Sequence, residues 1–459
     1  MNYNNIFIFL LFLLFLFPVR ISAQQHSHSV INPKLPDVKN PSIPTPRYNS
    51  PFNNSNNPYQ SQTSGHTNLH VPDDSQQRNA ALIREIEEYQ AYINRQKTQK
   101  EKDADYLTKN GFPFQGNNPT LTGTEHYYTA FDTINQMLSG KIPLHLGKAI
   151  FLVENAYYEN KLNYSDYEKA LKEKVNFCHM LMKEEKIDTS KCMAKNMVLF
   201  RLITDTIKVK LKGTERTYIS YPIKYDYKDF KSEKSYDSHF VTKLMRTNEG
   251  QCNSMPLYYL ALAEQLGAEA YWAFSPWHSF IRIKDNKGNW YNLELTNGYI
   301  MSDAHYINNS YIKAEALQNK IYMTPMDKKQ TIAELLNNLA LGYINKYGYD
   351  NFVLQCAKTS KQHSDRDLNA LMIEADYYTR LTLTIARLLE AKQPEILKEK
   401  SPQAYKYYEK MLELYEQIDN TGFEELPVPL YEKWLEYIAN EKEKAKSNNR
   451  LLQNSIIGK

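Results

Sequence analysis

A cysteine and a histidine in the middle of the chain have the residue types and neighbours that nucleophilic catalysis requires. Cys252 comes directly before an apolar run with helical spacing, 255–266. The start of a helix carries unpaired backbone N–H groups and the positive end of the helix dipole, so it favours the thiolate, the nucleophilic form of cysteine. The same N–H groups can hold the oxyanion of a tetrahedral intermediate. His278 follows Ser-Pro-Trp at the start of an expected strand, where its imidazole can act as the general base for the thiol.

An acidic residue on the next strand can complete a triad. The segment 285–288, Asp-Asn-Lys-Gly, is a turn sequence, and an antiparallel pairing across it places His278 opposite Glu294. Directly opposed residues share a face of a hairpin, with Cβ atoms about 5 Å apart. Glu294 can therefore accept a hydrogen bond from the second ring nitrogen and orient the imidazole. Asn292 shares this face on the diagonal and is an alternative, and Gln251 is a candidate donor to the oxyanion.

Structural roles compete with this interpretation when each residue is taken alone. A cysteine before an apolar helix is usually a core residue, and a histidine in a hairpin is usually a hydrogen-bonded polar residue. His239 and His305 flank the region, and we expect both to be structural or surface residues. The sequence has no glycine-rich phosphate loop and no G-x-S-x-G motif, which argues against nucleotide enzymes and serine hydrolases. The combination of a helix-start cysteine, a strand-start histidine and a cross-strand glutamate favours catalysis.

The elements that must position these residues are one helix and the strands that follow it. Apolar residues at helical spacing predict a helix over 252–266, with Gly267 as its C-terminal stop. Strands are expected over 269–274, 279–284 and 290–295. The three candidate residues would thus meet where the start of the helix faces the sheet.

These segments resemble transglutaminase-like domains. The segment 249–254 (EGQCNS) resembles the start of their nucleophile helix, 276–280 (PWHSF) resembles their histidine strand, and 290–296 (WYNLELT) occupies the place of their third motif. The resemblance is to bacterial proteins in which this core is flanked by helices and followed by tetratricopeptide-like helices. It implies a papain-like α+β core, a Cys–His–acid triad, no metal and no cofactor. The family usually has Asp where this chain has Glu294. Cross-linking members often have Trp where this chain has Asn253, which argues against protein cross-linking.

The whole chain is expected to be α+β, with this core between helical regions. Residues 1–23 have the apolar core and small-residue end of a secretory signal peptide, and 24–76 have the Asn, Ser, Pro and Gln content of a disordered tether. A helical region is expected over 77–200, the core over 201–325, and a C-terminal helical region with a faint tetratricopeptide-like period over 326–459. Helices are expected over 127–138, 146–155, 164–183, 332–347, 370–391, 404–418 and 431–445, and a strand pair over 207–211 and 218–225.

The chain has four cysteines, and we expect the exported protein to be in an oxidising compartment. Cys178 and Cys192 lie on either side of a short connection between helical segments, and they are candidates for a disulfide. Cys356 has apolar neighbours and is expected to be an inert core thiol. No pair of cysteines has the spacing of metal ligands, which argues against a structural zinc site.

Composition narrows the partners and the location. A net charge of +4 and a pI near 8.5 are too mild to predict nucleic-acid binding. No second apolar segment approaches the roughly 20 residues of a membrane span, so the mature protein is expected to be soluble, in the periplasm or secreted. The oligomeric state stays open.

The expected activity is acyl transfer or hydrolysis at peptide or glutamine-type amides. The substrate would be a peptide, a protein or a component of the cell envelope, attacked by Cys252. One alternative is a catalytically inactive scaffold or binding protein of the envelope with the same fold. Another is a helical repeat adaptor, which would have no sheet over 269–295. The choice between hydrolysis and transfer also stays open.

Overall fold

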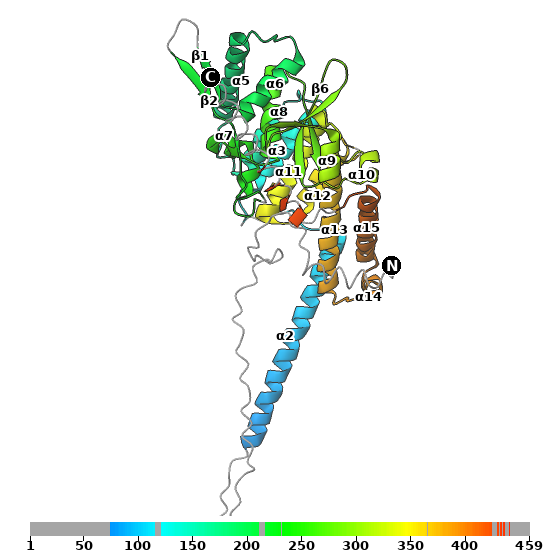
Figure 1. Cartoon of the computed structure of the whole chain (residues 1–459). Coiled ribbons are helices and arrows are strands. Elements are labelled where there is room, and N and C mark those ends of the chain that lie inside the picture. The colour runs from blue at the N-terminus through cyan, green and yellow to red at the C-terminus, as the bar shows by residue number, and fades with distance from the viewer. Residues whose placement is uncertain are drawn as a thin grey trace, which may run out of the picture. The chain divides into compact units, whose positions relative to one another are not determined.

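The structure is a computed structural model, shown in Figure 1. It describes residues 74–440 except 115–120, 211–215, 231, 365, 425–428, 431, 434 and 437–439. The described residues fall into two units, one up to Asp103 and the other from Ala104 onwards. The expected signal peptide, nearly all of the expected tether and most of the expected helix over 431–445 lie outside the described residues.

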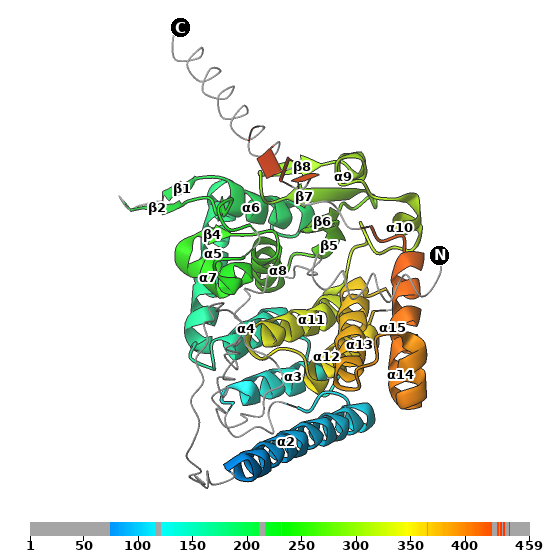
Figure 2. The same ribbon diagram turned by 90° about the horizontal axis from the view of Figure 1, so that it is seen from below.

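The described chain mixes helices with small sheets, as the α+β expectation requires. Before the sheet come five longer helices: α2 (Asp74–Asn110), α3 (Thr124–Leu138), α4 (Leu146–Tyr157), α5 (Tyr164–Glu184) and α6 (Cys192–Thr204). After it come α11 (Lys328–Tyr347), α12 (Asn351–Lys361), α13 (Leu368–Leu388), α14 (Pro394–Lys400) and α15 (Pro402–Asn420). In this second group α11 packs on α12, α12 on α13, and α13 on α15 (Figures 1 and 2).

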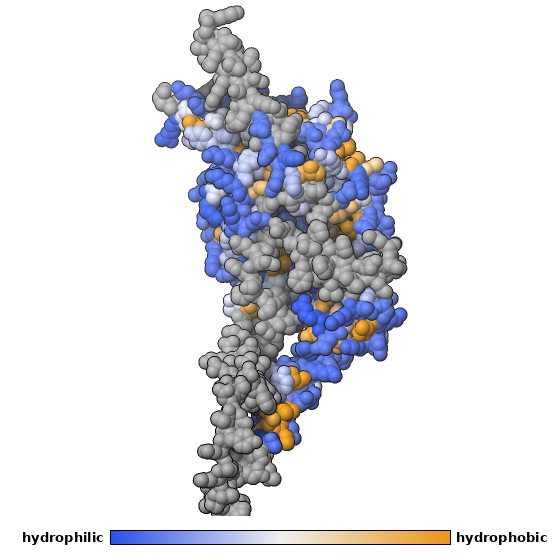
Figure 3. Space-filling view, turned by 60° about the horizontal axis from the view of Figure 1, so that its bottom comes forward, coloured by the Kyte–Doolittle hydropathy of each residue, from blue (hydrophilic) through white to orange (hydrophobic). Residues whose placement is uncertain are grey.

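Helix α2 carries an exposed apolar stripe. Its apolar side chains recur every three or four residues, which places them on one side of the helix. They are exposed by 44–64%, and Figure 3 shows apolar groups gathered along this helix. The members are Leu82, Ile83, Ile86, Tyr89, Tyr92 and Ile93.

The main sheet has four antiparallel strands in the order β5-β6-β7-β8. Its strands are β5 (Tyr271–Ser275), β6 (His278–Lys284), β7 (Trp290–Glu294) and β8 (Tyr299–Met301). The helical-adaptor alternative predicted no sheet here, and it is therefore wrong. Two smaller sheets accompany it: β1 (Ile207–Lys210) pairs antiparallel with β2 (Thr217–Ser220), and β3 (Lys224–Tyr225) pairs parallel with β4 (Glu249–Gly250).

The register of β6 and β7 differs from the expected one by two residues. Ile281 lies opposite Leu293, so continuing the ladder puts Phe280, not His278, opposite Glu294. The cause is a longer turn, which the backbone N–H of Asp285 closes by donating to the carbonyl of Asn289 at 3.0 Å. Because side chains alternate with a period of two, this shift keeps the histidine and the glutamate on the same face.

Helix α8 (Ser254–Leu266) lies at the centre of the larger unit. It packs against α4, α5, α6 and α7 (Val241–Thr247) and against the first two strands of the main sheet (Figure 2). Nearly all its side chains are buried, as expected of a helix that is apolar all round. The carboxylate of Glu264, near its end, accepts from the backbone N–H groups of Leu146 and Gly147 and so caps α4. Gly267 ends α8 with φ 67°, in agreement with the sequence.

Candidate active site

Cys252 lies in the turn that leads into α8. The helix begins at Ser254, two residues later than expected, but the backbone N–H of Met255 already donates to the carbonyl of Gln251 at 3.0 Å. The cysteine is thus inside the first helical turn, and its side chain is half-buried. Gly250 precedes this turn, and a Cβ there would lie 2.5 Å from Cδ1 of Leu244. A larger residue at this position would therefore force the neighbouring core side chains to shift.

Two contacts hold this turn against the start of β6. The thiol of Cys252 donates to the carbonyl of Trp277, with Sγ 4.0 Å from the oxygen. The hydroxyl of Ser279 donates to the carbonyl of Cys252. The residues on both sides of His278 therefore contact the cysteine, which fixes the histidine beside it.

His278 enters the strand through a two-residue turn. Ser275 pairs with His278, so only Pro276 and Trp277 connect β5 to β6. The second turn position is Trp277, with φ 59°. Glycine or asparagine normally takes such a conformation, and a bulky aromatic residue there is strained. Strain of this kind is concentrated at functional sites.

The imidazole of His278 is bonded to the carboxylate of Glu294 inside the protein. Nε2 lies 2.7 Å from Oε2, and each side chain is 1% exposed. The hydroxyl of Tyr306 also donates to Oε2 at 2.7 Å, and the backbone N–H of Thr296 donates to Oε1 at 2.9 Å. Each carboxylate oxygen thus accepts at least one hydrogen bond, which removes much of the cost of burying the charge.

The electrostatics of this pair favour the ionised form of both partners. Burial lowers the pKa of His278, but the charge of Glu294 and hydrogen bonds with Cys252 and Glu294 outweigh it and raise the pKa to about 10. Burial raises the pKa of the Glu294 carboxyl, but the imidazolium charge and the hydrogen bonds to the carboxylate lower it to about 2. At neutral pH the pair is an imidazolium and a carboxylate.

The two supporting residues expected from sequence lie elsewhere. The Nδ2 group of Asn292 donates to the carboxylate of Asp303 at 2.7 Å, because Asn292 lies opposite Arg282 in the sheet. The side chain of Gln251 is buried, where its Oε1 accepts from Ser232 Oγ at 2.7 Å. Asn292 is therefore not the partner of the histidine, and the Gln251 side chain is occupied by a neighbouring loop.

The expected disulfide between Cys178 and Cys192 is absent, and both residues are free thiols. Cys178 is buried within α5, and burial raises its pKa to about 12. Cys192 begins α6, where its sulfur accepts from the backbone N–H of Glu269 at 3.1 Å. The disulfide was expected because the two cysteines are close in sequence, but closeness in sequence does not make two side chains point at each other. Cys356 is a buried free thiol, as expected.

The remaining histidines of the region have structural surroundings. Burial lowers the pKa of His239 to about 4, and its backbone carbonyl accepts from Asn253 Nδ2 at 3.1 Å. Nδ1 of His305 is hydrogen-bonded to the side chain of Asn309, and burial lowers the pKa of its imidazole.

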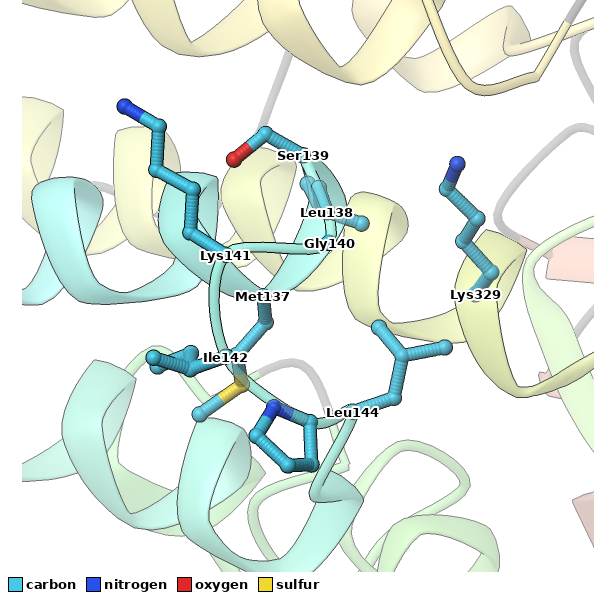
Figure 4. A pocket seen from close by; sticks show the side chains of 9 residues that line it. Met137, Leu138, Ser139, Gly140, Lys141, Ile142, Leu144 and Lys329 are labelled. Carbon is cyan, nitrogen blue, oxygen red and sulfur yellow. The ribbon is translucent and has the colours of Figure 1, made fainter.

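A cavity of 440 Å³ lies apart from these residues. It is lined by the end of α3, the loop that follows and Lys329 (Figure 4). None of Cys252, His278 and Glu294 lines it. Among the described residues, no group of three or more His, Cys, Asp or Glu side chains is arranged to hold a metal ion. Within the same part of the chain, no helix has an apolar stretch long enough to cross a membrane.

Comparison with known proteins gives no relative. No family model matches the sequence, no curated protein matches it, and no solved structure matches the fold.

Proposed function

We propose that this protein is an exported cysteine acyltransferase or amidohydrolase of the transglutaminase-like kind, with a papain-like core formed by α8 and the main sheet. The observation that supports it best is the buried His278–Glu294 pair directly beside Cys252. A buried imidazolium and carboxylate are costly to maintain for packing alone. They are useful beside a thiol, because they stabilise the thiolate and fix the imidazole that must move its proton.

The proposed reaction is the exchange of an amide for a thioester. The Cys252 thiolate attacks the amide carbonyl carbon, and the carbonyl oxygen becomes an oxyanion. In this proposal, backbone N–H groups at the start of α8 donate to the oxyanion. The C–N bond then breaks as His278 gives its proton to the departing amine. Water or a second amine, deprotonated by the neutral imidazole, attacks the thioester, and the thiolate is released.

Glu294 keeps the imidazole in one orientation throughout this cycle. Its carboxylate accepts from Nε2, so Nδ1 is the ring nitrogen left for the exchange with Cys252. In this role the carboxylate stays ionised and stabilises the imidazolium, as the acid does in other nucleophilic triads. The apolar N-terminal segment 1–23 supports export and therefore substrates of the cell envelope.

The test is a search for an acyl-enzyme. The full mature chain is incubated with peptides that contain glutamine side-chain amides and with an activated ester, and the mass of each cysteine peptide is measured. The proposal expects an acyl adduct on Cys252 and release of ammonia or amine, both lost in Cys252→Ala. Cys192→Ala removes another half-buried thiol and is the matched control, with activity retained.

A catalytically inactive binding protein is the competing function. It is favoured by the cavity in Figure 4, which is lined by none of Cys252, His278 and Glu294. If no amide or ester yields a Cys252-dependent adduct while His278 still controls the reactivity of the thiol, the substrate class is wrong. If the thiol is indifferent to His278, the enzyme proposal is wrong and the binding protein replaces it.

A further inference from the structure

One residue that the proposed mechanism does not use reaches the centre of the site. Tyr306, on α9 (Asp303–Asn309), is fully buried, and its hydroxyl donates to the same carboxylate oxygen of Glu294 that accepts from His278. A carboxylate held by the imidazole alone could rotate about its last side-chain bond. The second donor on Oε2, with the Thr296 N–H on Oε1, restricts that rotation.

The strand that carries the histidine also holds the ring of Tyr306. This ring stacks on Phe280 with centroids 4.0 Å apart and planes 16° from parallel. Phe280 is two residues after His278 on β6 and shares its face of the sheet. The hydroxyl and the imidazole are thus fixed relative to each other through one strand.

A polar clamp ties α9 to the sheet one helical turn before Tyr306. The carboxylate of Asp303 accepts two hydrogen bonds from Nη2 of Arg282, at 3.0 and 3.1 Å, and one from Nδ2 of Asn292 at 2.7 Å. Arg282 and Asn292 are opposed on β6 and β7, so the clamp joins α9 to both strands of the triad. Asn292, from the sequence segment 290–296, therefore contributes to this clamp.

We propose that Tyr306 is a positioning residue for the triad, held in place by the Asp303 clamp, and that it fixes the plane of the Glu294 carboxylate which orients His278. The inference rests on the proposed function, since it assigns a part in the same chemistry. It also predicts an effect on ionisation, because a donor to a carboxylate favours its charged form. The titratable groups that face Glu294 are His278 on β6 and Tyr306 and His305 on α9.

The test is Tyr306→Phe, which keeps the ring and its stacking and removes only the hydroxyl. The rate of Cys252 alkylation is measured from pH 3.5 to 8 on the native full chain, so no substrate is needed. Loss of one hydrogen bond to a charged group predicts an acid limb about one pH unit higher, so that the rate at any given pH on that limb is about tenfold lower. Tyr311→Phe, at an exposed tyrosine just after α9, should match the wild type.

Asp303→Asn is the second variant, because it loosens α9 without touching Glu294. Asp303→Asn should lower the alkylation rate and shift the acid limb to higher pH, both by less than Tyr306→Phe does. If circular dichroism shows that Tyr306→Phe does not fold, the result for Asp303→Asn decides the test. A folded Tyr306→Phe with the wild-type profile would overturn the inference. His278→Ala is measured alongside: if that variant also leaves alkylation unchanged, it is the proposed function that fails.

Discussion

The Nε2 atom of His278 lies 2.7 Å from Oε2 of Glu294, although the ladder between their strands does not pair the two residues. The contact is diagonal, and the longer glutamate side chain spans it. Phe280, which the ladder places opposite the glutamate, instead stacks on Tyr306. The extra methylene of glutamate relative to aspartate therefore has a geometric use here, because it helps the carboxylate to reach across the two-residue offset between Phe280 and His278.

Native alkylation should single out Cys252 among the four cysteines. Cys178 and Cys356 are buried and should react only after unfolding, whereas Cys252 and Cys192 are half-exposed. At pH 7 we expect His278→Ala to slow iodoacetamide labelling of Cys252 at least tenfold, because the positive charge beside the sulfur is lost. Labelling of Cys192, read by mass spectrometry in the same sample, is the internal standard. Equal slowing at both residues would contradict a specific effect of His278, and labelling of Cys178 or Cys356 would show that the variant is misfolded.

Removing the charge of Glu294 should change the state of the imidazole. In Glu294→Gln the main favourable interaction of the imidazolium is gone while burial remains, so the pKa of His278 should fall well below its value of about 10. The change can be followed by ¹⁵N NMR of the histidine ring. Any Cys252-dependent amide cleavage should fall at least a hundredfold. Glu249→Gln, at an exposed position on β4, is the matched control, and an identical loss in both variants would contradict the role of Glu294.

The buried pair should stabilise the fold only within a pH window. The raised pKa of His278 contributes stability below its ordinary value of 6.5, and this is lost as the pH rises towards about 10. The lowered pKa of Glu294 contributes stability above its ordinary value of 4.5, and this is lost as the pH falls towards about 2. The stabilisation is therefore greatest between pH 4.5 and 6.5.

Unfolding of His278→Gln and the wild type should reveal this window. We expect the difference in unfolding free energy to be about 1–3 kcal/mol near pH 5.5 and to shrink towards both extremes. The measurement is denaturant unfolding at a series of pH values. A difference that stays constant with pH would show that the substitution acts through packing and not through charge.

Gly250 should be sensitive to the smallest substitution. A Cβ there would lie 2.5 Å from Cδ1 of Leu244 and 2.9 Å from Cγ of Met255, both in buried residues. Gly250→Ala should therefore lower the unfolding free energy by about 1–3 kcal/mol and slow the alkylation of Cys252. Gly147→Ala is the matched control, since a Cβ at this helical site would have only ordinary contacts of 3.6–3.8 Å. That variant should be as stable as the wild type or slightly more stable; a similar loss in both would refute the argument.

The sequence predicted the local elements of the site well because their signals are local. Apolar spacing and Gly267 located the helix, and alternation located the strands. The contact between His278 and Glu294 was expected correctly although the register was wrong by two residues, since a period of two preserves the face. The turn length was the source of the error: the turn closes at Asn289, one residue beyond the Asp-Asn-Lys-Gly segment.

What the sequence did not reveal depends on side-chain direction and on distant packing. Tyr306 lies on a short helix that the Arg282–Asp303 ion pair holds against the sheet. Arg282 and Asp303 are far apart in the sequence, and no rule of residue spacing predicts that they pair. Asn292 lies on the expected face of the sheet, but its side chain donates to the carboxylate of Asp303, a member of that ion pair. Cys178 and Cys192 were close in sequence, yet one faces the core and the other the backbone of Glu269.

Trp277 gives the site an optical reporter of its own. Its backbone carbonyl contacts the thiol of Cys252. Trp277 itself has the left-handed backbone conformation in this turn, and its indole is half-buried. An acyl group on the sulfur would displace the thiol from that carbonyl, and the surroundings of the indole would change with it. The chain has only four tryptophans, so the fluorescence of this one would stand out from a small background. Its emission would make the rise and decay of an acyl-enzyme visible in a stopped-flow instrument with unlabelled substrates.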